Sequence, residues 1–202
     1  MYKFPIIVFE GIEGSGKTFH IKNIVKFLKN KKIKFINFRE PGGSINAEKI
    51  RKLILDQKSN FNNLTDLFLY IAARNENFHN ILKKYHKKRV ILIDRFTDST
   101  MAYQHYGMGI NKKLIIQLNK IILKNIKPTF TFLNTVNMKN LQSRVNKRAK
   151  NRYDNFNNNF YKKVQNGFIK LAKNKKNYKI IDSNLSIEKN KKLIIKKINS
   201  LL

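Results

Sequence analysis

The sequence contains no cysteine, few acidic residues and no long apolar run, and each shortage excludes a class of protein. Without cysteine the chain cannot form a disulfide scaffold, a thiolate metal site or a cysteine nucleophile. No apolar run reaches the roughly 20 residues that span a bilayer. The first apolar stretch breaks at Glu10, unlike a signal peptide. We therefore expect a cytoplasmic protein without a membrane segment.

Acidic residues number 12 against 43 lysines and arginines, which gives a formal net charge of +31. Such a charge is typical of proteins that bind nucleic acid. The lysines, however, are scattered among many Asn, Ile, Phe and Tyr residues, whose codons are rich in A and T. A bias in the coding sequence is a sufficient explanation, so we do not expect a nucleic-acid partner. A steep salt-dependent affinity for DNA would support the opposite interpretation.

Arginine and glycine are scarce enough for their positions to be informative. A planar guanidinium binds phosphate or a base edge in a way that an ammonium cannot. Glycine permits tight backbone geometry in loops that hold ligands. Seven of the eight glycines fall in three short turns, at positions 11, 14, 16, 42, 43, 107 and 109. The eight arginines are at positions 39, 51, 74, 89, 95, 144, 148 and 152.

Strand-like and helix-like patterns alternate along the chain. The length of 202 residues suits a single domain, residues 1–202. Alternation predicts an α/β fold with a five-stranded parallel sheet and helices on both faces. The expected strands are 4–9, 33–38, 90–93, 129–133 and 178–181. The expected helices are 17–30, 47–55, 64–85, 112–125, 138–150, about 159–173, and 187–201.

Three loops follow the ends of expected strands, at residues 11–18, 39–44 and 94–104. Ligands of parallel sheets collect beyond the carboxyl ends of the strands, so these loops should share one cleft. A fourth stretch, residues 151–159, is the most polar and least periodic part of the chain, and we expect a mobile loop there.

The first loop has the spacing Gly11-x-x-x-x-Gly16-Lys17-Thr18, which is typical of a phosphate-binding loop between a strand and a helix. Its backbone N–H groups and the positive end of the following helix would hold phosphate oxygens. Lys17 would bridge the outer phosphates, and the Thr18 hydroxyl would take a magnesium position. The predicted ATP-binding residues are Gly11, Ile12, Glu13, Gly14, Ser15, Gly16, Lys17 and Thr18.

The rest of the sequence narrows the class of phosphate-binding protein. A regulatory GTPase would carry Asn-Lys-x-Asp and Asp-x-x-Gly, and neither pattern occurs. An ATPase motor would be larger, so a small kinase remains. Tyr70 and Arg74 stand four residues apart, on one face of the expected helix. They suit a flat base, one by stacking and the other by hydrogen bonding; a core tyrosine and a surface arginine are the open alternative.

Several motifs together resemble the thymidylate kinase family, whose members phosphorylate dTMP with ATP. They are the glycine loop, Arg39-Glu-Pro-Gly-Gly43, Ala72-Ala-Arg74, Asp94-Arg-Phe96 with Ser99-Thr-x-Ala-Tyr-Gln104, and a lid segment around 144–159. The resemblance implies a P-loop NTPase fold of the nucleoside monophosphate kinase type. It also implies magnesium, a role in dTTP biosynthesis, and a homodimer through a long helix such as 64–85.

The resemblance also implies roles for individual residues around the acceptor phosphate. Arg51 and Arg95 would hold the phosphate of dTMP, with the backbone near Pro41. Glu13 matches the family's acidic residue near the sugar and this phosphate. Asp94 would order magnesium through water.

A second set of residues would hold the nucleoside part of dTMP. By the same resemblance, Tyr70 would stack on thymine and Arg74 would bind a base carbonyl. Thr100 and Gln104 would line the base pocket. Tyr103 would sit against the deoxyribose, where a 2′-hydroxyl would crowd it.

Gly14 and Ser15 occupy loop positions where one form of the family carries an arginine. The chain resembles the other form, which brings arginines from the lid. Arg144, Arg148 and Arg152 recur every fourth residue, so a helix would align them in a stripe. We expect Lys17, Arg95, Arg148 and Arg152 to be catalytic.

Two other functions compete with this interpretation. A deoxynucleoside kinase has an uncharged acceptor, which would leave Arg51 and Arg95 without a partner. A nucleic-acid-binding protein or regulatory nucleotide switch is suggested only by the net charge. Turnover of dTMP distinguishes the kinase from both.

Overall fold

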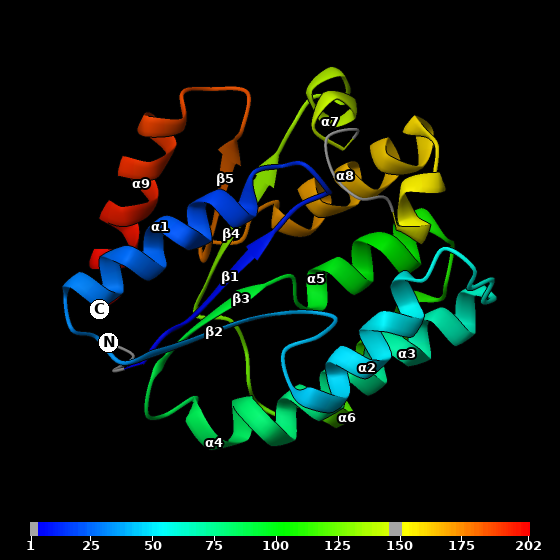
Figure 1. Cartoon of the computed structure of the whole chain (residues 1–202), viewed down its shortest axis with the longest axis horizontal. Helices are drawn as coiled ribbons and strands as arrows, with labels where there is room; N and C mark the ends of the chain where they lie inside the picture. Colours follow the sequence, from blue (N-terminus) through cyan, green and yellow to red (C-terminus); the bar gives the residue numbers. More distant parts are fainter. Residues whose placement is uncertain (1–3, 146–150) are drawn as a thin grey trace.

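The computed structural model describes residues 4–145 and 151–202. Its centre is a five-stranded sheet in the order β2-β3-β1-β4-β5, with every neighbouring pair parallel (Figure 1). The predicted α/β fold is confirmed, and each strand starts and ends within two residues of its expected bounds. The strands are β1 (Ile6–Glu10), β2 (Phe35–Arg39), β3 (Val90–Asp94), β4 (Phe130–Thr135) and β5 (Tyr178–Asp182).

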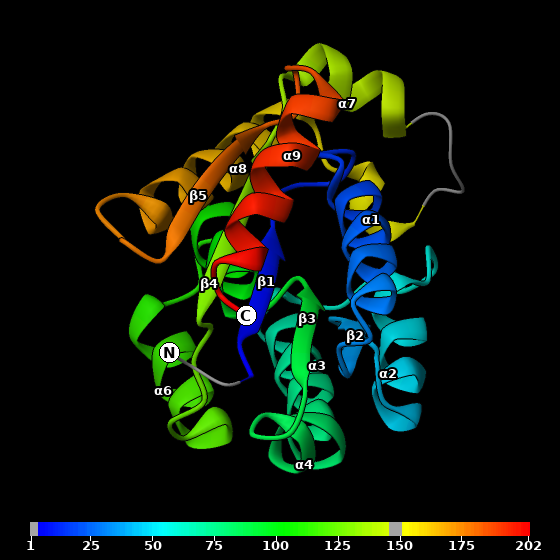
Figure 2. The same ribbon diagram turned by 90° about the vertical axis from the view of Figure 1, so that its left-hand side faces the viewer.

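Helices cover both faces of the sheet because the side chains of its central strands are apolar on both sides. On one face, α1 (Lys17–Asn30) and α9 (Ile187–Asn199) lie together (Figure 2). Their buried residues pack on alternate strand positions such as Phe9 and Leu92. On the other face the packing helices include α3 (Asn63–Asn77), α6 (Lys112–Leu123) and α8 (Asn158–Ala172).

Two expected segments have a different structure. The expected helix 64–85 is α3 followed by a π-helical segment, η1 (Phe78–Leu82), and a short α4 (Lys83–Tyr85). The expected loop 94–104 is wrong beyond its first turn: α5 (Thr97–Thr100) and the π-helical η2 (Met101–Gly107) follow β3. Sequence periodicity did not predict α5 and η2, because their polar residues face a cavity rather than solvent.

The remaining elements are α2 (Ile45–Leu55), α7 (Met138–Val145) and a 3₁₀ turn, η3 (Arg152–Asn155). The expected irregular stretch 151–159 therefore begins with a capped turn, in which Asn151 accepts from Tyr153 N at 2.9 Å. The turn is anchored because the Tyr153 side chain is buried. Of the expected helix 138–150, the last five residues lie outside the described residues, and so does Arg148.

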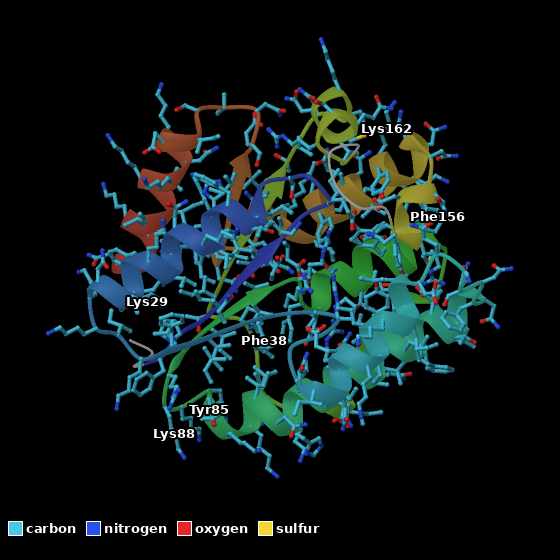
Figure 3. All side chains as sticks on the ribbon, in the orientation of Figure 1. Lys29, Phe38, Tyr85, Lys88, Phe156 and Lys162 are labelled. Atoms are coloured by element: carbon cyan, nitrogen blue, oxygen red, sulfur yellow. The ribbon has the colours of Figure 1, made fainter. Side chains whose placement is uncertain are left out.

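The surface carries its positive charge in scattered form. Lys29, Lys88 and Lys162 lie on different sides of the molecule, whereas Phe38 points into it (Figure 3). Within the described part of the chain, no helix combines the length and the apolar character needed to cross a membrane.

Candidate active site

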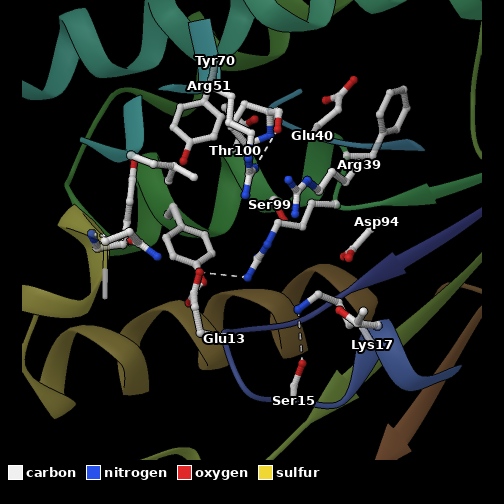
Figure 4. A pocket seen from close by; sticks show the side chains of 18 of the residues that line it. Glu13, Ser15, Lys17, Arg39, Glu40, Arg51, Tyr70, Asp94, Ser99 and Thr100 are labelled. Atoms are coloured by element: carbon white, nitrogen blue, oxygen red, sulfur yellow. Dashed lines mark hydrogen bonds and ion pairs between the residues drawn. The ribbon is translucent and has the colours of Figure 1, made fainter. Parts of the chain in front are cut away.

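A cavity of about 410 Å³ lies beyond the carboxyl ends of β1, β2 and β3. All three predicted loops contribute to it, as expected for a parallel sheet. Arg51, Tyr70 and Thr100 stand across this cavity from Ser15 and Lys17 (Figure 4). The predicted site residues that line it are Glu13, Gly14, Ser15, Gly16, Lys17, Thr18, Pro41, Arg51, Tyr70, Arg74, Asp94, Arg95, Thr100, Tyr103 and Gln104.

The phosphate-binding loop is shaped by glycines with positive φ. Gly11 has φ +134°, and an added Cβ there would lie 2.2 Å from Asn134 O. Gly11 and Ile12 do not line the cavity, because the Ile12 side chain belongs to the core. Both residues instead offer their carbonyl oxygens to the Lys17 ammonium, at 2.8 and 2.9 Å. The loop thus holds its own lysine in place before any phosphate arrives.

Lys17 is an unusually acidic ammonium group. Its side chain is buried, and burial together with the nearby Arg95 guanidinium lowers the pKa of Lys17 to about 8. The carboxylates of Asp94 and Glu13 oppose this shift. A bound anion would add to their effect, so the lysine is suited to a phosphate ligand.

Arg95 connects the second half of the site to the phosphate-binding loop. Its Nη2 donates to Glu13 Oε1 at 2.9 Å, and the Tyr103 hydroxyl donates to Glu13 Oε2. Burial raises the pKa of Glu13, but Arg95 and Tyr103 outweigh it and the net pKa is lowered. Arg95 also lies over the Tyr103 ring, 5.3 Å from its centroid. Its backbone has φ +68°, which is unusual for a residue with a side chain.

Arg51 is the second arginine at this end of the cavity. Its Nη1 donates to Pro41 O at 2.7 Å, which fixes the guanidinium against the second loop. Arg39, at the end of β2, lines the same cavity. Three guanidinium groups from separate elements therefore surround a space suited to an anion.

Arg74 is not the surface charge of the alternative interpretation. Its side chain is 1% exposed and pairs with the buried Glu40, Nε to Oε2, at 2.7 Å. Its other nitrogens donate to Asn119 Oδ1 at 2.7 Å and Phe96 O at 3.0 Å. A guanidinium has five N–H donors, so donors remain for a ligand. Tyr70 is partly buried and lines the cavity beside it.

Four buried polar atoms of this cavity's lining have no hydrogen-bond partner within the described structure: Glu40 Oε1, Asp94 Oδ1, Thr100 Oγ1 and Gln104 Oε1. Buried polar atoms are ordinarily satisfied, so each of these is expected to meet a ligand or an ordered water. From the sequence, Asp94 was assigned to magnesium and Thr100 and Gln104 to dTMP, whereas Glu40 had no assigned role.

The arginines of the lid segment are separated. Arg144 lines the cavity, and its Nη1 donates to Gly14 O at 2.8 Å, directly over the phosphate-binding loop. Arg152 does not line the cavity; it pairs with the buried Asp66 and lies over the Phe61 ring. Arg148 is outside the described residues.

Sequence reasoning missed Glu10, the last residue of β1. Its side chain is buried and accepts from Phe96 N at 2.8 Å and from Ser99 Oγ at 2.5 Å. These bonds hold the turn that carries Arg95. Burial, and then the charge of Asp98, raise the pKa of Glu10 to about 7. An acidic residue at the end of an apolar run was its only signal in the sequence.

Asp66 and Tyr153 were missed for a different reason. Tyr153 lines the cavity and donates to Asp66 Oδ2 at 2.5 Å, although 87 residues separate them. No local pattern joins the start of α3 to η3, so only the folded chain places them together.

Comparison with known proteins gives a consistent result. The family described as thymidylate kinase matches residues 9–194. Thymidylate kinase of Mycoplasma capricolum is 38% identical over 188 residues, covering 90% of this chain and 88% of the relative. That of Thermosipho africanus is 36% identical, covering 90% and 91%. The solved structure of thymidylate kinase from Ehrlichia chaffeensis matches with a TM-score of 0.78 at 32% identity, covering 96% and 98%.

Proposed function

The chain belongs to the thymidylate kinase family, and on that premise we propose how its own residues divide the work of phosphorylating dTMP. The enzyme is a nucleoside monophosphate kinase that converts dTMP to dTDP with ATP as phosphoryl donor. Little covalent chemistry is required of the protein in such a transfer. Its task is to align the two nucleotides and to compensate negative charge.

We assign the donor phosphates to the first loop. The backbone N–H groups between Gly11 and Thr18 surround them, and Lys17 exchanges its carbonyl partners for the outer phosphates. Arg144 already contacts the loop at Gly14 O, so it would add positive charge at the donor side. The absence of a side chain at Gly14 leaves room for it, since an added Cβ would lie 3.3 Å from Arg144 Cβ.

We assign the phosphate of dTMP to Arg51 and Arg95. The observation that carries this proposal is that both guanidinium groups line the same cavity as Lys17, with Arg51 across it from the phosphate-binding loop. Glu13 holds Arg95 from the loop side and Pro41 O holds Arg51 from the other. The two phosphates would then approach each other between cationic groups that are fixed before the substrates bind.

We assign the base and sugar of dTMP to the inner wall. Tyr70 supplies the ring for stacking, and Arg74 the donors for a base carbonyl. Thr100 and Gln104 offer buried polar atoms that have no partner in the described structure. Tyr103, fixed by its bond to Glu13, would lie against the deoxyribose.

Magnesium fits the residues at the centre of the cavity. Asp94 lines it with a buried, unpartnered Oδ1 atom, and Thr18 stands at the start of α1 beside the loop. Among the described residues no cluster of three His, Cys, Asp or Glu side chains could hold a metal by itself. The ion would therefore bind mainly to ATP phosphates and water, with Thr18 and Asp94 completing its shell. It would neutralise charge on the phosphates.

We retain Arg148 and Arg152 as candidates for charge compensation at the transferred phosphoryl group. Arg152 is held at Asp66 here, outside the cavity lining. For Arg152 to reach the phosphates, that ion pair would have to open, which could happen when the lid closes over the substrates.

An acceptor-specificity assay tests the proposed function. With ATP and magnesium, turnover of dTMP should far exceed that of GMP, CMP and AMP, and equal activity on those would refute it. Thymidine separates this enzyme from a deoxynucleoside kinase, because it lacks the phosphate that Arg51 and Arg95 would bind. It should compete with dTMP only weakly. Because one methyl is worth about 0.8 kcal/mol, weak activity on dUMP is expected.

We also propose that the enzyme is a homodimer. Helices α2, α3 and α6 pack side by side and expose apolar side chains, which a second copy would cover (Figure 1). Sedimentation of the wild type and of Phe68→Glu, which places a charge on this face, would test it. The exposed large apolar residues of these helices are Ile45, Leu53, Leu64, Phe68, Ile116 and Ile121.

The net charge requires no nucleic-acid partner, because its lysines are dispersed. We propose that DNA is not retained near physiological salt, where a dedicated binding surface would still hold it. A cytoplasmic location suits an enzyme whose substrates are free nucleotides.

A further inference from the structure

Asp66 lies behind the base pocket and does not line the cavity, yet its carboxylate receives three side chains. Its side chain is 2% exposed, and it stands in the first turn of α3. Oδ2 accepts from Gln104 Nε2 at 3.1 Å and from the Tyr153 hydroxyl at 2.5 Å, while Oδ1 pairs with Arg152. Both oxygens of this buried carboxylate are therefore engaged as acceptors.

The contact with Asp66 determines which way the Gln104 amide faces. The two ends of an amide are nearly equal in size and opposite in hydrogen bonding. With a carboxylate oxygen at 3.1 Å and the Tyr153 hydroxyl oxygen at 3.4 Å, the nitrogen is the only end that fits beside Asp66. A carbonyl oxygen in the same place would face the negative carboxylate. The orientation therefore follows from charge.

The fixed amide leaves one atom of Gln104 for a ligand. Gln104 Oε1 is buried, has no partner in the described structure, and belongs to a residue that lines the cavity. Thr100, four residues earlier, presents its own unpartnered Oγ1 in the same wall. A hydroxyl can donate or accept, whereas an amide oxygen can only accept. Gln104 thus imposes a direction on hydrogen bonding in this wall.

Pyrimidine bases differ in that direction at ring position 3. Thymine and uracil carry an N–H donor there, whereas cytosine carries a bare nitrogen acceptor. An acceptor on the protein would satisfy the first and repel the second. If the amide could turn over, its NH₂ would suit cytosine equally well, and the pocket would lose this distinction.

We propose that Asp66 is a positioning residue for acceptor choice: by binding the Gln104 amide nitrogen, it keeps Oε1 toward the base and so favours thymine over cytosine. The proposal rests on the proposed function, in which Gln104 contacts the base. Tyr153 and Arg152 complete the carboxylate's partners. Asp66 and Gln104, two buried side chains, would thereby control which nucleoside monophosphate is accepted.

The test compares kcat/KM for dTMP and dCMP, two acceptors with the same sugar and phosphate. In Asp66→Asn the side chain presents an oxygen or an amide to Gln104, so both orientations of Gln104 become available. The kcat/KM for dTMP divided by that for dCMP should fall about tenfold, the effect expected from losing one hydrogen bond. Asp66→Ala, which cannot hold the amide either way, should give a similar fall. Loss of folded enzyme alone would lower both activities equally and leave the ratio unchanged.

A double-mutant cycle shows whether Asp66 acts through Gln104. Gln104→Met removes the amide while keeping the length of the side chain, so adding Asp66→Asn should change the ratio no further. If Asp66→Asn lowered the acceptor ratio equally in the wild type and in Gln104→Met, the proposal would be overturned. Tyr153→Phe keeps the contact between Asp66 and Gln104 and should keep the ratio; a tenfold fall there would assign the orienting role to Tyr153.

Asp98→Asn is a matched control. Asp98 also accepts from a tyrosine hydroxyl, that of Tyr178, and stands 3.9 Å from Lys175, but it does not line the cavity. The acceptor ratio should stay at the wild-type value. A wild-type enzyme without preference for dTMP would overturn the proposed function itself. A preference that survives every Asp66 substitution would overturn only the role of Asp66.

Discussion

Arg95 donates from Nη2 to Glu13 Oε1 at 2.9 Å, and this ion pair joins the turn after β3 to the phosphate-binding loop. Glu13 belongs to the loop proposed to hold the donor phosphates, and Arg95 is proposed to hold the phosphate of dTMP. The pair therefore sets the position of an acceptor-side arginine from the donor-side loop.

Glu13→Gln should raise the KM for dTMP several-fold, because the neutral amide no longer fixes the Arg95 guanidinium. Arg95→Lys should raise it more, since an ammonium cannot bind Glu13 and a phosphate as a fork does. The KM for ATP should change less than about twofold in Glu13→Gln. Steady-state kinetics with each substrate varied would measure both, with the exposed Glu188→Gln as control. Equal changes in both KM values would contradict this division.

Binding of ATP should take up a proton near pH 8. With a pKa of about 8, the Lys17 amine is half neutral there in the ligand-free enzyme, and phosphates would restore its charge. The uptake should be roughly half a proton, detectable as a binding heat that depends on the ionisation enthalpy of the buffer. Lys17→Arg, charged at every working pH, should abolish the dependence. Identical binding heats for the wild type in two buffers of different ionisation enthalpy would rule out this proton uptake.

Glu10 should make stability depend on pH between its ordinary and its native pKa. The native pKa, about 7, lies above the ordinary 4.5, so the unfolded chain ionises first as pH rises. The wild type therefore loses stability from pH 4.5 to 7 and loses no more above it. At about 1.4 kcal/mol per pKa unit, the loss is about 3 kcal/mol.

Glu10→Gln removes this ionisation, and its free energy of unfolding relative to the wild type should rise over the same interval. Urea denaturation at a series of pH values would measure the difference. Asp98 and Arg95 act on Glu10 in opposite directions and stay in place in both proteins. A difference that is constant with pH would exclude Glu10 as its source.

Gly11→Ala should be severely destabilising, by at least about 3 kcal/mol. The new Cβ would lie 2.2 Å from Asn134 O, a backbone atom that cannot move alone, and φ is +134°. Gly109→Ala is a matched control, because φ is +81° there but no atom lies within 4 Å. It should cost only about 1 to 2 kcal/mol. Similar losses in the two variants would show that close approach is not the cause at Gly11.

Arg152→Ala and Arg148→Ala should lower turnover by roughly two orders of magnitude or more while changing dTMP affinity much less. The reason is that a lid arginine compensates charge mainly during transfer. Rapid-quench kinetics and dTMP binding would separate the two effects. Arg89→Ala, whose guanidinium lies 5.1 Å from the Tyr85 ring centroid, is the control. Unchanged turnover in both lid variants would remove these arginines from the mechanism.

The sheet and most helices could be predicted because their signals are local. Apolar runs such as the one ending at Glu10 mark buried strands, and the glycine spacing before Lys17 marks a phosphate-binding loop. The helix beginning at Thr97 could not be recognised, because its Thr100 and Gln104 side chains face a cavity. Hydrophobic periodicity predicts a helix when one face is apolar and packs on the core while the other is polar and faces solvent. A face that lines a ligand cavity follows neither pattern.

The sequence by itself determined the family, the parallel sheet and most of the side chains that line the cavity, because each rests on neighbours along the chain. Only the tertiary structure decided how those side chains hold one another. It placed Arg74 on Glu40, Arg144 over Gly14, and Gln104 against Asp66. Such contacts join residues up to 130 positions apart. Their geometry depends on how the elements pack, and packing leaves no local pattern in the sequence.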